Sequence, residues 1–155
     1  MTAPAEIALA APDVLRRGMS ETFSSAAVAD KFASYPPALR ERMLGLRALV
    51  LETAAATPGV RRIEETLKWG QPSYLTPETG SGTTVRIDAH PGGGVAMFVH
   101  CQTNLVETFR RHYPGLDYEG ARAIVMRDGP VNEAALRHCI GLALTYHARK
   151  MGKIA

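Results

Sequence analysis

The clearest hydrophobic pattern in the chain begins after Pro36-Pro37 and has the spacing of an amphipathic helix. Its apolar positions follow one another in steps of four and three residues: Leu39, Met43, Leu46, Val50 and Thr53. The polar positions fall on other faces: Arg40, Arg47 and Glu52. Proline is tolerated in a first helical turn, and Pro58-Gly59 ends the pattern. We therefore predict a long helix over residues 38–56 with one buried stripe.

The middle of the chain changes to the two-residue period of a strand. Apolar and polar residues alternate from Val85 to His90, and Pro91-Gly92-Gly93-Gly94 follows. Residues 95–100 are then apolar on both faces over much of their length. Two strands around a glycine-rich turn indicate an antiparallel hairpin between residues 83–90 and 94–100, with the second strand central in its sheet.

The sequence also predicts three further helices, each from a residue that can cap its start, and one further strand. Ser24 or Ser25 can cap a helix that reaches Tyr35, and Asn104 with Glu107 resembles a capping box for a helix to His112. Residues 121–126 read as a strand. Asn132 can cap a last helix over residues 132–150. Its buried face is predicted from five positions: Leu136, Ile140, Ala143, Leu144 and His147.

The run from Ile63 to Tyr74 contains the only tryptophan of the chain, Trp69. It begins as an apolar-polar alternation, breaks at Gly70 and restarts after Pro72. Gly70 can take a positive φ, and Pro72 favours an extended conformation at the residue before it. We expect a bend between two short strands, with Trp69 and Tyr74 flanking a cavity, since both rings offer a large apolar body with a polar tip.

Helices at both ends and strands between them predict an α+β fold with a mostly antiparallel, curved sheet flanked by N-terminal and C-terminal helices. A chain of 155 residues fits one domain. Residues 1–22, rich in Ala and Pro, are expected to be a flexible leader, and residues 23–155 a single domain.

The composition indicates in which cellular compartment the protein is expected. The two cysteines, Cys101 and Cys139, are too few for a disulfide framework, and no segment reaches the ~20 apolar residues of a membrane span. The first residues lack the basic segment of a secretory signal. A cytoplasmic protein without a membrane partner is therefore expected. The net charge of +3 permits attraction to anionic partners.

The sequence carries no recognisable catalytic, metal or cofactor motif. His100 and Cys101 are neighbours on a strand and point to opposite faces, while His138 and His147 lack helical metal spacing. The glycine runs at 80–82 and 92–94 do not open helices, so phosphate cradling is not expected. Nucleic-acid binding is disfavoured because only ten aromatic residues are present and the core needs most of them.

The run Trp69-Gly70-Gln71-Pro72-Ser73-Tyr74 resembles the "WG-x-P-x-Y" motif of the YdhG-like domain family, which is largely of unknown function. Tyr35-Pro36 with the segment from Arg40 to Leu49 resembles that family's "YP…R…L…LR" opening. The likeness covers roughly residues 26–150 and implies a frataxin-like architecture. One branch of the family has been connected with iron delivery. Iron favours hard oxygen ligands, but this chain is net basic and its only adjacent acidic pair is Glu64-Glu65.

Three functional hypotheses follow. The favoured one is a small-ligand-binding or accessory module with a pocket beside Trp69 and Tyr74, closed by the loop at residues 77–82. Lys68 or Arg86 would orient an anionic ligand there, and Glu65 a cationic one. The second is an iron-handling chaperone using Glu64 and Glu65. The third is an enzyme whose residues converge only in the fold.

Overall fold

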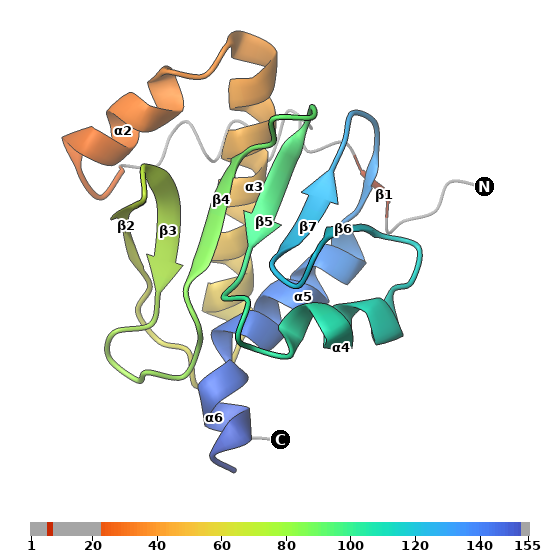
Figure 1. Cartoon of the computed structure of the whole chain (residues 1–155). Coiled ribbons are helices and arrows are strands. Elements are labelled where there is room, and N and C mark those ends of the chain that lie inside the picture. Colours follow the sequence, from red (N-terminus) through yellow and green to blue (C-terminus); the bar gives the residue numbers. More distant parts are fainter. Residues whose placement is uncertain (1–5, 8–22, 153–155) are drawn as a thin grey trace.

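The computed structural model describes residues 6–7 and 23–152, which form five helices around a six-stranded antiparallel sheet (Figure 1). The strand order is β2-β3-β4-β5-β7-β6. The strands are β2 (Glu64–Lys68), β3 (Gln71–Leu75), β4 (Val85–Ala89), β5 (Val95–Phe98), β7 (Ala123–Met126) and β6 (Asp117–Glu119). Helices α3 (Pro37–Ala56) and α5 (Glu133–Leu144) lie behind the sheet in Figure 1, and no helix lies in front of β4 and β5. The predicted α+β class is confirmed.

Helix α3 forms as the spacing of its apolar residues predicts, and its apolar stripe packs against the sheet. Met43, Leu46 and Val50 are fully buried in the main core, which also takes in alternate residues of β4 and β5. The prediction for Arg47 is wrong: its side chain is 2% exposed. The helical pattern could not predict this burial, because the carboxylate of Glu65 that pairs with Arg47 lies on the neighbouring β2.

The hairpin of β4 and β5 is confirmed, with Ile87 opposite Met97 and Ala89 opposite Val95. The bend at residues 69–70 also joins two strands as expected, since β2 and β3 pair from Glu64 opposite Leu75 to Lys68 opposite Gln71. The central position of β5 between β4 and β7 explains why all four of its residues are buried.

The last helix is not continuous over residues 132–150. It stops at Leu144, and α6 (Tyr146–Lys150) restarts after Thr145. The break lies where the loop before β4 forms hydrogen bonds with the helix backbone. Thr83 N donates to Ala143 O, and Ser81 Oγ donates to Leu144 O. Ser81 O also accepts a hydrogen bond from Ala148 N. His147 consequently turns to solvent instead of extending the buried face.

The helix starts follow their predicted caps except at α4 (Leu105–His112). Ser25 caps α2 (Ala26–Ala33) by accepting from Val28 N, and Asn132 caps α5 by accepting from Ala135 N. The Asn104 side chain makes no capping bond, so the predicted capping box is wrong. Thr103 Oγ1 instead accepts from Leu105 N at 3.4 Å.

The predicted leader lies mostly outside the described residues. Within it, Glu6–Ile7 form β1, which pairs with β8 (Val131–Asn132). None of the helices in the described part is both long and apolar enough to span a bilayer.

Candidate functional site

The β2–β3 turn holds the tryptophan at its tip. Trp69 and Gly70 are the two central residues, and both have positive φ, 56° and 74°. This is the pattern of a type I′ turn, which normally takes Asn-Gly and not a bulky side chain. The Trp69 side chain is 89% exposed. The backbone therefore carries strain at a residue whose ring has little packing to offset it.

We expect Trp69→Asn to raise the free energy of unfolding by about 1 kcal/mol, because Asn tolerates the left-handed region at less cost. Urea unfolding followed by circular dichroism measures this without relying on tryptophan fluorescence. Trp69→Ala keeps a non-glycine residue at a positive φ, so it should not raise the free energy of unfolding to a comparable extent. A loss of ~3–5 kcal/mol in either variant would mean that the ring packs as a core residue does.

Tyr74 and Glu65 lie beneath this turn in a buried polar cluster. Arg47 Nε lies 2.6 Å from Glu65 Oε2, and the Tyr74 hydroxyl donates to the same oxygen at 2.9 Å. The Arg47 guanidinium also stacks 4.4 Å from the centroid of Phe23, and Ser24 Oγ donates to the Glu65 carbonyl. The cluster joins α3, β2 and β3 with the segment before α2.

The charges within this cluster set its ionisation. Burial alone would raise the pKa of Glu65, but the hydrogen bonds and charge of Arg47 outweigh burial and lower it. Burial first, and then the charge of Glu65, raises the pKa of Tyr74 well above its usual value. Glu65 thus remains an anion whose partner is already in place.

The structure does not bring the five predicted site residues together. The sequence analysis expects Tyr74 and Glu65 to face a ligand, but Tyr74 is fully buried and Glu65 is paired with Arg47. Lys68 is exposed at the end of β2, and the register places both Lys68 and Arg86 on the face of the sheet opposite to that of Tyr74 and Glu65. The loop at 77–82 packs against the α5–α6 junction instead of closing over Trp69. None of the described cavities is lined by Trp69 or Tyr74.

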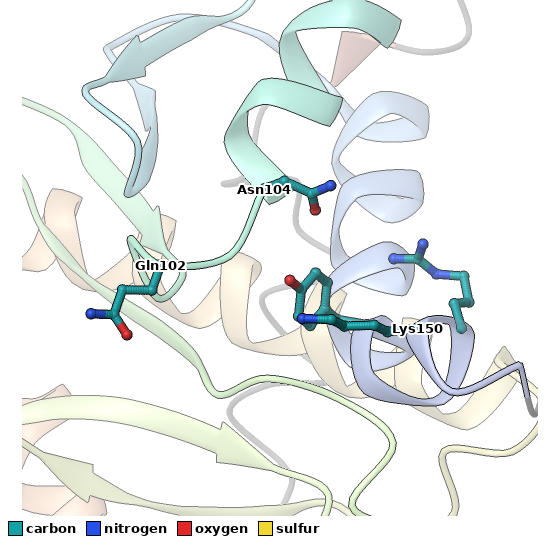
Figure 2. A pocket seen from close by; sticks show the side chains of 5 residues that line it. Gln102, Asn104 and Lys150 are labelled. Carbon is teal, nitrogen blue, oxygen red and sulfur yellow. The ribbon is translucent and has the colours of Figure 1, made fainter.

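A cavity of about 420 Å³ lies where α6 faces the loop between β5 and α4 (Figure 2). Its lining consists of two amides, one phenol and two cations: Gln102, Asn104, Tyr146, Arg149 and Lys150. Figure 2 shows Lys150 reaching from α6 toward that loop, and Asn104 extending from the start of α4 toward the side of α5 and α6. No carboxylate of the described residues lines this cavity.

The two cations of this cavity, which we call the α6 cavity, have different roles. The Arg149 guanidinium is held in place, since it donates to Leu142 O at 2.7 Å and to Thr145 Oγ1 at 3.1 Å. Lys150 Nζ lies 5.7 Å from the centroid of Tyr146. Within the described part of the chain no carboxylate pairs with either residue. A fixed guanidinium, an ammonium that pairs with no described carboxylate, and an amide that makes no capping bond suit an oxyanion.

The loop that breaks the last helix also positions this cavity. A Cβ at Gly82 would lie 2.5 Å from Leu144 Cα, so only glycine lets residues 81–83 pack this closely against the junction. The hydrogen bond from Ala148 N to Ser81 O then fixes the start of α6. Tyr146 and Lys150 are presented to α4 as a result.

The sequence analysis did not predict this site. It gives Asn104 a capping role, and it singles out none of the other four lining residues. Among the described residues there is also no group of three or more His, Cys, Asp or Glu side chains that could hold a metal ion. Cys139 is buried, and Cys101 is exposed.

No known family model matches this sequence, and neither does any curated protein. Among solved structures, the chain is similar to the crystal structure of YdhG from Bacillus subtilis, a protein of the DUF1801 family. The TM-score is 0.54, and the match covers 79% of this chain and 91% of that chain at 19% sequence identity. At this identity the likeness establishes the fold, and the chain therefore has the α+β fold of the Bacillus YdhG protein.

Proposed function

We propose that this chain is a YdhG-like binding protein that holds a small molecule bearing a phosphate or carboxylate group in the α6 cavity. The observation that carries the proposal is the lining: it contains two cations and two side-chain amides, and none of the described carboxylates. The volume of about 420 Å³ is within the range of small-molecule sites. Tyr146 offers a ring for the apolar part of such a ligand.

Membership of the YdhG-like family is part of the proposal. Its support is the shared fold together with the motif residues Trp69, Gly70, Pro72 and Tyr74. The geometry gives three of them a structural reason, because Trp69 and Gly70 form the turn and the Tyr74 hydroxyl donates to Glu65.

A thermal-shift and calorimetric screen of phosphate monoesters and small carboxylates tests the binding role, since a ligand that binds only the folded state raises stability. Lys150→Gln should weaken binding of the best ligand about tenfold, the loss of one charge-assisted contact. Lys68→Gln is the matched control, because it removes the same charge from the β2–β3 turn. If Lys68→Gln weakened binding and Lys150→Gln did not, the α6 cavity would be the wrong site.

An accessory role is the second candidate, and the exposure of Trp69 favours it. A strained, solvent-exposed tryptophan is the kind of residue that binds a partner protein, because its ring is enriched at the centres of interfaces. Trp69→Ala should then abolish capture of that partner while leaving oxyanion binding in the α6 cavity unchanged.

The iron-handling alternative has weaker support. Its proposed ligand Glu65 is paired with Arg47 and is 6% exposed, which leaves Glu64 without the neighbouring carboxylate that the hypothesis requires. Metal analysis of the purified protein would decide it, since iron retained in stoichiometric amount would favour the chaperone role.

A further inference from the structure

A second group of cations lies on the face of the sheet opposite α3 and α5. The strand register places Arg86 opposite Phe98, and Phe98 opposite Ala123. Phe98 belongs to a small buried cluster separate from the main core, with Ala96, Ala123 and Val125. In Figure 1 no helix of the described residues lies in front of this part of the sheet.

Two guanidinium groups lie over the same aromatic ring. The Cζ atom of Arg86 is 5.6 Å from the centroid of Phe98, and that of Arg122 is 5.3 Å from it. Cation–π attraction and burial of the side-chain stems favour this arrangement. It also holds two like charges close together, which is unfavourable until an anion joins them.

The charge of Arg86 has no counter-ion among the described residues. Its Nη1 donates to the neutral Gln71 Oε1 at 2.8 Å. The nearby carboxylate of Asp88 is engaged elsewhere, because it accepts from the Tyr35 hydroxyl and from Gln71 Nε2. The Arg86 guanidinium is therefore half-buried and hydrogen-bonded to a neutral amide, and no described carboxylate neutralises its charge.

Arg122 is only partly neutralised. Its Nη2 lies 3.2 Å from Glu119 Oε2, while the other oxygen of that carboxylate is 2.6 Å from His90 Nε2. Burial first, and then the charge of Arg122, lowers the pKa of Arg86. The direction of this shift agrees with an uncompensated pair of cations.

We propose that Arg86 and Arg122 form a second oxyanion site above Phe98, which takes a phosphate or carboxylate group. Each planar guanidinium can donate two parallel hydrogen bonds to such a group, and the edge and face of Phe98 keep both stems in position. This site is independent of the α6 cavity, whose lining residues it does not share.

The test uses the full chain with Lys150→Gln as background, so that the α6 cavity does not contribute. Binding of inorganic phosphate, and separately of acetate, is measured by calorimetry at low ionic strength. Arg86→Gln and Arg122→Gln should each weaken whichever anion binds about tenfold. Arg127→Gln is the control, since it removes an equal charge from an arginine that pairs with Asp117.

The two anions identify the group that the site prefers, phosphate or carboxylate. The proposal is overturned if neither anion binds, or if Arg127→Gln weakens binding as much as Arg86→Gln does. Circular dichroism of each variant confirms that its fold is intact. Failure of the α6 cavity would show as equal ligand binding by the unmodified protein and its Lys150→Gln variant, so the two proposals fail separately.

Discussion

Replacing Glu65 with Gln is expected to lower the free energy of unfolding by about 3–5 kcal/mol, because it removes the carboxylate charge that pairs with the buried Arg47 guanidinium. The Tyr74 hydroxyl would also lose its charged acceptor. Chemical unfolding measures the change. The neighbouring exposed residue supplies the matched control, since Glu64→Gln should alter stability by no more than about 0.5 kcal/mol. Equal effects of the two substitutions would show that the buried ion pair contributes nothing.

The same pair gives a pH dependence of known sign. The folded-state pKa of Glu65 is lowered, so its contribution to stability is present above the unfolded pKa of about 4.3. That contribution is lost as the pH falls through the lower folded-state pKa. We therefore expect the stability difference between the unmodified protein and Glu65→Gln to be constant near neutral pH and to narrow in acid. A difference that widened below pH ~4 would contradict the assignment.

Gly82→Ala is expected to cost about 3 kcal/mol of stability, at the upper end for overpacking, because the added methyl group would meet backbone atoms of Leu144. Backbone cannot rotate away as a flexible side chain can. The substitution should also weaken oxyanion binding, since the hydrogen bonds of residues 81–83 hold α6 and with it Tyr146 and Lys150.

Gly115→Ala controls for the general effect of adding a methyl group to a glycine. Its Cβ would have no neighbour within 4 Å, and its φ is not positive. Stability within about 0.5 kcal/mol of the unmodified protein is expected. If Gly82→Ala were as stable as Gly115→Ala, the close packing of the loop against the helix junction would not be what separates α5 from α6.

The periodicity of apolar residues predicted those helices and strands whose formation depends on a local sequence pattern. The stripe of α3 and the alternation of β4 are local signals, and the turn at Gly70 has a local cause. Periodicity could not predict the break at Thr145. That break depends on hydrogen bonds from Ser81 and Thr83, which lie some sixty residues earlier in the chain.

The partners of Glu65 and Tyr74 could not be predicted from the sequence. A glutamate and a tyrosine beside an unusual turn suggest a ligand site, but Glu65 pairs with Arg47, which the helical pattern places off the buried stripe of α3. Lys68 and Arg86 do not line the α6 cavity. Within the described residues Lys150 pairs with no carboxylate and the Asn104 side chain makes no capping bond, but both facts depend on the fold and not on a local sequence pattern.

The most direct test of the central claim is a nitrogen–proton NMR titration of the full chain with inorganic phosphate. The account predicts that backbone and side-chain signals of Gln102, Asn104, Tyr146 and Lys150 shift together and saturate with one dissociation constant. The backbone signals of Trp69 and Gly70, which belong to neither proposed oxyanion site, should stay in place. Saturable shifts at the β2–β3 turn, with those of Asn104 and Lys150 unmoved, would contradict it.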